Sequence, residues 1–209
     1  MFKADVSSDP RFNNVLMSGS LVKEYIENYQ DVLRSVLANI PSEVLETALS
    51  FLKNAVLARN TVYVAGNGGS AAIAEHLSCD WMKGTRGSDG RVLRVQSLVS
   101  NVALCTAISN DYGYEKVFST QLEMLAKPGD VLVLISSSGN SPNIRMALKK
   151  ANELGIKVIG MSGFSGGALR EMSDVSIHVD FSNYGIVEDA HQIIMHGLAQ
   201  CLVKHFESN

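Results

Sequence analysis

The chain begins with two stretches whose apolar residues recur at helical spacing. The first runs from about Val15 to Ala38. A second helix starts at Pro41-Ser42, with Ser42 as its expected N-cap. Its apolar stripe comprises Val44, Leu45, Ala48, Leu49, Leu52, Val56 and Leu57. Because the first helix is apolar on more than one side, we expect another subunit to cover it.

From Thr61 onward, short β-rich apolar runs alternate with helical segments. The strands are expected at 61–65, 91–98, 130–135, 157–162 and 175–179. Helices are expected at 70–83, 100–110, 114–126, 141–154, 166–172 and 186–206, and Gly155 is the expected αL cap of the fourth of these. The run from 130 to 135 is almost wholly apolar, as expected for a strand covered on both faces. The pattern predicts an α/β fold: a three-layer, doubly wound sandwich with a five-stranded parallel sheet, preceded by two N-terminal helices.

Composition limits the size and class of the protein. With 209 residues, 46% hydrophobic and 19% charged, one domain over 1–209 is expected, with a helical oligomerisation segment at 1–60 and an α/β core at 61–209. The formal net charge is −3, so the composition does not predict a basic surface that binds nucleic acid. Arg91 and Arg94 alone do not form a basic patch. No apolar run is long enough to span a bilayer, so no membrane association is expected.

The cysteines and the N-terminus favour a cytoplasmic location. Cys79, Cys105 and Cys201 are odd in number, far apart and form no Cys-x-x-Cys motif. We interpret them as reduced, small hydrophobic residues, which suits the cytosol. The first twelve residues contain no apolar h-region of a signal peptide.

A glycine-rich loop follows the first predicted strand, and parallel sheets bind ligands beyond the carboxyl ends of their strands. Its residues are Gly66, Asn67, Gly68, Gly69 and Ser70. Glycines let the backbone approach a ligand closely, and the helix N-terminus that follows favours an anion. The loop lacks the Lys of a Walker A loop and the third glycine of Gly-x-Gly-x-x-Gly, so no nucleotide cofactor is expected. A tight turn with Ser70 as an ordinary N-cap remains the alternative.

A second loop carries four hydroxyls between an apolar strand and a helix: Ser136, Ser137, Ser138 and Ser141. Hydroxyl and backbone N–H donors bind phosphate without adding positive charge. Pro142 suits the first turn of the helix that follows. A flexible linker is a poor alternative, because the loop joins two rigid elements. Together the two loops predict a site for a phosphorylated ligand.

Polar residues interrupt two of the predicted helices. His76 and Asp80 lie four positions apart and share a face. In the last helix, Glu188 and His196 are eight positions apart and also share a face, with Asp189 and His191 close by. Two histidines and two carboxylates can chelate a divalent ion such as zinc, or can serve as acid and base without a metal. For any one of these residues, a structural hydrogen bond or salt bridge is the alternative.

The two loops resemble those of the SIS (sugar isomerase) domain, and the longer motifs resemble the phosphoheptose isomerases. The resemblance covers about residues 15 to 206. It rests on 66–72 with His76, 107–113, 117–119 with Gln121, 128–131 and 138–143.

The resemblance implies a homotetramer whose neighbouring subunits complete each active site. It implies interconversion of sedoheptulose 7-phosphate and a heptose 7-phosphate. It also implies that the loop 136–141, with Asn67 and Ser70, holds the phosphate. Several family members bind zinc through the positions that are here His76, Asp80, Glu188 and His196, and the family's proposed acid–base pair corresponds to Asp80 and His196.

This chain departs from the family at four site positions. The family glutamate is Asp80, the glutamine is Glu188, an aspartate after the second strand is Asn101, and an arginine is Ile186. Asp80 is one methylene shorter than glutamate, and Glu188 adds a negative charge that strengthens a metal site but repels a nearby phosphate. We keep Asn101 among the expected substrate-binding residues.

The leading hypothesis is an aldose–ketose phosphosugar isomerase that works through an enediol. Asp80 is the expected base and His196 the second acid–base group, while His76 and Glu188 orient the pair or complete a zinc site. The alternative is a non-catalytic phosphosugar-binding or adaptor protein, as in relatives that bind the DnaA replication initiator. Paired acid and base residues favour the enzyme, because an adaptor needs neither. A sugar-phosphate sensor is less favoured, since no basic helix-turn-helix segment is visible.

Overall fold

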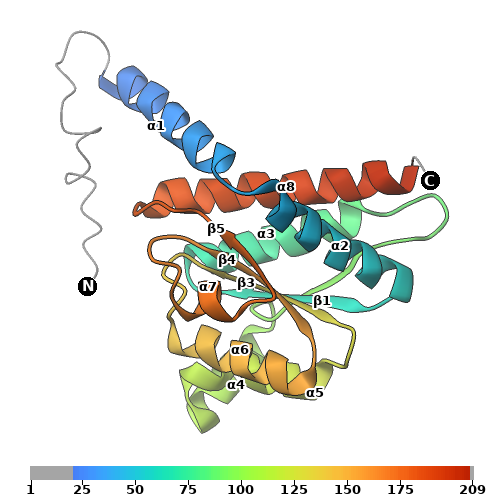
Figure 1. Cartoon of the computed structure of the whole chain (residues 1–209). Helices are drawn as coiled ribbons and strands as arrows, with labels where there is room; N and C mark the ends of the chain where they lie inside the picture. Colours follow the sequence, from blue (N-terminus) through green and yellow to red (C-terminus); the bar gives the residue numbers. More distant parts are fainter. Residues whose placement is uncertain (1–20, 208–209) are drawn as a thin grey trace.

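Five parallel strands form the centre of the fold (Figure 1). The computed structural model describes residues 21–207. The strands are β1 (Thr61–Gly66), β2 (Arg94–Ser97), β3 (Val131–Ser136), β4 (Lys157–Ser162) and β5 (Val175–His178). Their order across the sheet is β2-β1-β3-β4-β5. The predicted five-stranded parallel sheet is confirmed.

Helices cover both faces of this sheet, as the alternating pattern predicts (Figure 1). One layer contains α1 (Leu21–Ala38), α2 (Ser42–Ala58), α3 (Gly69–Gly84) and α8 (Tyr184–Glu207). The other contains α4 (Val102–Tyr112), the 3₁₀ turn η2 (Tyr114–Lys116), α5 (Val117–Leu125), α6 (Pro142–Leu154) and α7 (Gly167–Met172).

Strand β3 shows why its residues 131–135 are all apolar. Val133 and Ile135 join the core that packs under α2, α3 and α8. Leu132 and Leu134 point the other way, into the core under α5 and α6. Because successive strand residues alternate between faces, a central strand covered on both sides needs an apolar residue at every position.

Two details differ from the sequence predictions. Ser42 is the first residue of α2 and Pro41 occupies the N-cap position, with no side-chain capping hydrogen bond, so the prediction of Ser42 as N-cap was wrong. Pro41 has φ −61° and ψ 136°, the extended geometry that an N-cap residue adopts, and its fixed φ favours the start of the helix there. The part of the first predicted helix that precedes Leu21 lies outside the described residues.

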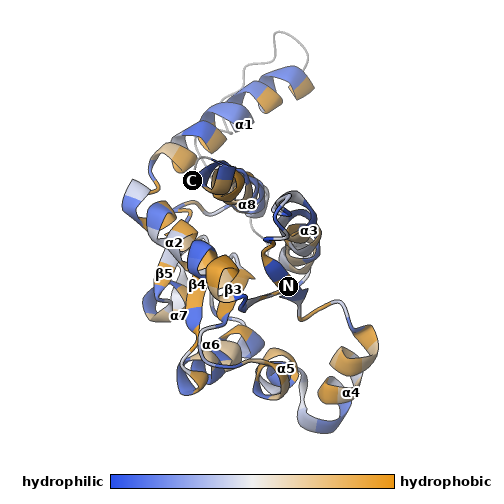
Figure 2. Cartoon of the chain, turned by 90° about the vertical axis from the view of Figure 1, so that its right-hand side faces the viewer, coloured by the Kyte–Doolittle hydropathy of each residue, from blue (hydrophilic) through white to orange (hydrophobic). Residues whose placement is uncertain are grey.

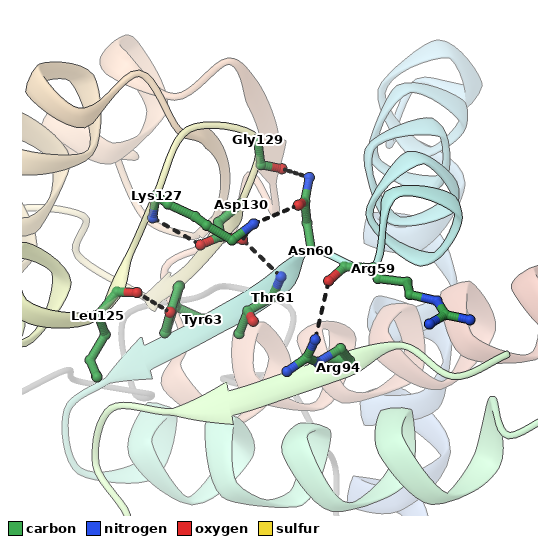
Figure 3. Close-up of polar contacts among 9 residues, drawn as sticks. All are labelled: Arg59, Asn60, Thr61, Tyr63, Arg94, Leu125, Lys127, Gly129 and Asp130. Carbon is green, nitrogen blue, oxygen red and sulfur yellow. Dashed lines mark hydrogen bonds and ion pairs between the residues drawn. The ribbon is translucent and has the colours of Figure 1, made fainter. Parts of the chain in front are cut away.

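A polar network fixes the start of β1 beside β3 (Figure 3). The buried Asp130 carboxylate accepts the N–H of Thr61 at 2.9 Å and the N–H of Lys127 at 2.9 Å. The Asn60 side chain donates to the carbonyl of Gly129 at 2.7 Å. The parallel pairing of β1 with β3 starts beside this network and continues along both strands. The glycine loop and the serine loop therefore leave the sheet side by side, from adjacent strands.

All three cysteines lie within the described residues, and none is paired in a disulfide. Cys79 and Cys201 are exposed, and Cys105 is half-buried. Across residues 21–207, no helix combines the length and apolar character that crossing a membrane requires.

Candidate active site

The glycine loop turns the chain sharply from β1 into α3. A Cβ on Gly66 would lie 2.6 Å from the carbonyl oxygen of Ser70, so this turn requires glycine. Gly68 has φ 56° and is the N-cap of α3, and a Cβ there would meet no atom within 4 Å. Ser70 is buried within the first turn, where its N–H donates to the Asn67 carbonyl at 3.0 Å, so it is not the N-cap. The backbone at Gly68 is thus open to a ligand.

The serine loop is buried at its first residues and reaches the start of α6 at its last. Ser136 and Ser137 are buried, and the N–H of Gly139 donates to the carbonyl of Ser136 at 3.0 Å. Gly139 has φ 65°, and a Cβ there would lie 1.8 Å from the carbonyl oxygen of Gly166. Ser141 is the N-cap residue of α6, but its hydroxyl makes no capping hydrogen bond. Ser138 is half-buried in the same loop.

An amide pair joins the two loops. Asn67 Nδ2 donates to Asn143 Oδ1 at 2.9 Å, and Asn143 Nδ2 donates to Asn67 Oδ1 at 2.8 Å. The Tyr114 hydroxyl also donates to Asn67 Oδ1 at 2.8 Å. Asn143 and Tyr114 were not predicted as site residues, although Asn143 lies within a motif that carries the family resemblance. We call the two loops and this pair the cradle.

Three of the four predicted metal-ligating residues lie together. Asp80 Oδ2 is 3.1 Å from His76 Nε2 and 3.1 Å from His196 Nε2. The two imidazole rings meet edge to face, with centroids 5.0 Å apart. All three ligand atoms lie within 4.8 Å of one another, and each side chain is between 38% and 46% exposed. Two imidazole nitrogens and one carboxylate oxygen fit a zinc ion, and we call these residues the triad.

Glu188 lies outside this triad. Its carboxylate lies at the start of α3, where a Cβ on Gly69 would be 2.6 Å from either oxygen. Burial raises the pKa of the Glu188 carboxyl, and the charge of Asp189 raises it further. Asp189 in turn accepts a hydrogen bond from the Tyr29 hydroxyl at 2.6 Å. Residues eight apart on a helix are separated by about 12 Å along its axis, which places Glu188 nearer the cradle than His196.

The loop after β2 completes this edge of the sheet. Asn101 is the exposed N-cap of α4, and its side chain accepts the N–H of Leu104 at 3.0 Å. Ser97 and Ser100 donate hydrogen bonds to Glu75 of α3, which ties this loop to the helix that carries the triad. Glu75 was not predicted, although it precedes His76. Ile186, at the family's arginine position, is fully buried in the core.

Comparison with known proteins identifies the family. The family model described as the SIS domain matches residues 24–163, which is more than half of the chain. The chain belongs to the SIS domain family.

Several relatives of this SIS domain chain are named phosphoheptose isomerase. A phosphoheptose isomerase of Geotalea daltonii is 39% identical over 183 residues, covering 88% of this chain and 94% of the relative. One of Aliarcobacter butzleri is 35% identical over 186 residues, covering 89% and 97%. The solved phosphoheptose isomerase of Neisseria gonorrhoeae superposes with a TM-score of 0.79 at 30% identity, covering 87% of this chain and 96% of that one. The similarity thus extends over nearly the whole length of this chain and of each relative.

Proposed function

We propose that this protein is a phosphoheptose isomerase that interconverts sedoheptulose 7-phosphate and a heptose 7-phosphate. The observation that carries the proposal is that one helix, α3, begins at the cradle and presents His76 and Asp80 further along. The rise from Gly69 to His76 is about 10 Å, a length that an open seven-carbon chain can span. A sugar with its phosphate in the cradle therefore places its C1 and C2 at the triad.

Asp80 is placed to act as the base. Its Oδ2 is engaged with both imidazoles, whereas Oδ1 makes no hydrogen bond to any of residues 21–207. Oδ1 takes a proton from C1 of the ketose to form the enediol, and the carboxyl, after exchanging that proton with solvent, delivers a proton to C2 to give the aldose. Without a metal, His196 moves the matching proton between the oxygens on C1 and C2, whereas with zinc bound its imidazole would serve as a ligand. His76 holds the Asp80 carboxylate in place from the opposite side.

The cradle supplies binding energy at a distance from the reacting carbons. Backbone N–H groups and hydroxyls of Ser136, Ser137, Ser138 and Ser141 grip the phosphate, together with Asn67, Gly68, Gly69 and Ser70. Asn101 reaches the sugar hydroxyls from the neighbouring loop. Such remote binding fixes the reacting carbons against Asp80, which raises the rate of the chemical step.

Zinc is the proposed cofactor, held by His76, Asp80 and His196. If zinc were held there, it would supply a positive charge against which negative charge on a substrate oxygen could develop. Glu188, the fourth residue predicted for this site, lies beside Gly69 in the structure and is not needed for the three-residue set.

We also propose a homotetramer in the cytoplasm. α1 extends away from the body of the protein (Figure 1), and hydrophobic bands alternate with hydrophilic ones along it (Figure 2). Val22 is 70% exposed, Leu21 52% and Ile26 48%, an unfavourable exposure that a second copy of the chain would cover. The location rests on the sequence alone. The adaptor alternative is not favoured, because the relatives with extensive coverage bear the isomerase name.

The substitution Asp80→Asn tests the assigned base. It keeps the shape of the side chain but removes its basicity, so kcat should fall by about a thousandfold while the melting temperature stays near that of the unmodified protein. Asp31→Asn on the exposed side of α1 is the matched control and should keep full activity. If Asp80→Asn retains normal kcat with sedoheptulose 7-phosphate, the assignment is wrong.

A further inference from the structure

A second pocket lies at the end of the sheet opposite the active site. It occupies about 300 Å³ where β1 and β2 begin, whereas the cradle lies where the strands end. Its lining is Val56, Arg59, Asp89, Gly90, Arg91, Val92 and Arg94. Three of these seven residues are arginines, in a protein whose overall charge is negative.

The charges in this pocket do not cancel. Asp89 forms an ion pair with Arg91 and is the only acid among the described residues that line the pocket. Within residues 21–207, neither Arg59 nor Arg94 forms an ion pair with an acidic side chain. Two guanidinium charges are therefore left uncompensated in a concave site, which concentrates positive potential there.

Backbone and ring contacts position the side chains of Arg91 and Arg94, whereas Arg59 is fixed by its backbone alone. Arg59 ends α2 with φ 54°, and its N–H donates to the Val56 carbonyl at 3.1 Å. Arg94 donates to the Arg59 carbonyl at 3.4 Å, while the Arg59 guanidinium extends away without a drawn contact (Figure 3). The Arg91 guanidinium lies 4.6 Å from the centre of the Phe206 ring. Such fixing lowers the entropy cost of binding.

We propose that this pocket binds the pyrophosphate group of a small metabolite, at a site separate from the active site. Guanidinium groups match phosphate oxygens in bidentate geometry, and two adjacent phosphates use the two uncompensated charges. A neighbouring cavity of about 500 Å³ shares Val56, Asp89 and Arg91 with the pocket. Its wall includes Leu202, Val203 and Phe206, which leaves room for an apolar or aromatic remainder such as a nucleoside.

Calorimetric titration with pyrophosphate and, separately, with ADP tests this site in the full chain. Both probes carry the proposed group, so both should bind at low salt, and ADP should bind more tightly if the larger cavity receives the nucleoside. The double variant Arg59→Gln/Arg94→Gln should weaken the affinity for either probe by about a hundredfold, roughly tenfold for each charge-assisted pair. The matched control Arg34→Gln removes a charge from exposed α1 and should bind as the unmodified protein does.

The same variants distinguish this pocket from the cradle. The double variant should keep the KM and kcat of the isomerase reaction, because neither arginine lies at the cradle or the triad. Pyrophosphate and ADP binding that persists unchanged in the double variant would place these ligands elsewhere and overturn the proposal. Binding of a short DNA strand with no binding of either probe would also overturn it. If the unmodified protein shows no isomerase activity, that result contradicts the proposed function and leaves the pyrophosphate site untouched.

Discussion

At the scale of single residues, His191 and His196 lie on the same helix but in different environments. His196 is half-buried and meets Asp80 at the surface. His191 is fully buried, with Nε2 3.2 Å from the Ser162 carbonyl oxygen and Nδ1 without a partner among the described residues. Burial lowers the pKa of His191 to about 4, and the nearby His178 contributes in the same direction.

This burial predicts a loss of stability in mild acid. The unfolded chain, with an ordinary histidine pKa near 6.5, binds more protons than the folded chain between about pH 6.5 and 4. Lowering the pH through this window should therefore reduce the free energy of unfolding, by about 3 kcal/mol from His191. Urea unfolding at a series of pH values measures this. His191→Gln should flatten the slope and His205→Gln should not. An equal slope in both variants would contradict the assignment to His191.

The sequence predicted the triad residues because helical spacing puts each pair on one face. It could not separate Glu188 from them, since sharing a face does not say how far apart two side chains lie along the axis. It also could not reveal that Gly69 leaves space for the Glu188 carboxylate, a contact between segments distant in the chain. Asn143 and Glu75 were missed for the same reason.

At the scale of elements, the cradle depends on β1 and β3 being neighbours. Alternating strands and helices predict a parallel sheet but do not give the order of its strands. The order β2-β1-β3-β4-β5 places β1 beside β3 and so brings the glycine and serine loops together, which lets Asn67 pair with Asn143. The helices and strands themselves were largely predicted, because β4 is apolar at most positions and α6 ends at Gly155 in the αL conformation.

Breaking the amide pair should loosen the cradle without removing the triad. Asn143→Ala deletes both hydrogen bonds to Asn67, so we expect KM for the sugar phosphate to rise by about tenfold and kcat to change less. Asn152→Ala, at an exposed position on the same helix, is the control. Steady-state kinetics measures both values. A fall in kcat alone, with KM unchanged, would show that the pair does not position the phosphate.

At the scale of the whole molecule, the layers were predictable but the role of α1 was only partly so. Its apolar pattern predicts burial, yet in a single chain Ile26 and Val22 remain exposed. The sequence pattern predicts that another surface covers α1, but it does not predict how the two surfaces pack. The arginine pocket was not predicted. Arg59 follows α2, and the whole of β1 and α3 separates it in the sequence from Arg91 and Arg94.

Assembly through α1 can be tested directly. Ile26→Glu puts a charge on the exposed apolar side of α1, so it does not disturb the core of the single chain. In a tetramer that uses this side, the charge would be buried. Light scattering after size-exclusion chromatography should show a tetramer for the unmodified protein and a smaller species for the variant. Glu27→Gln, at an adjacent exposed position, should remain tetrameric. A variant Ile26→Glu of unchanged mass would exclude α1 from the interface.

The most direct test of a joined cradle and triad is turnover of sedoheptulose 7-phosphate in D₂O, with zinc added or omitted, followed by NMR. Unphosphorylated sedoheptulose is the matched substrate that lacks only the group the cradle binds. We predict formation of a heptose 7-phosphate with deuterium at C2, and no conversion of the unphosphorylated sugar. Unchanged sedoheptulose 7-phosphate under both zinc conditions, or equal turnover of the two sugars, would contradict this.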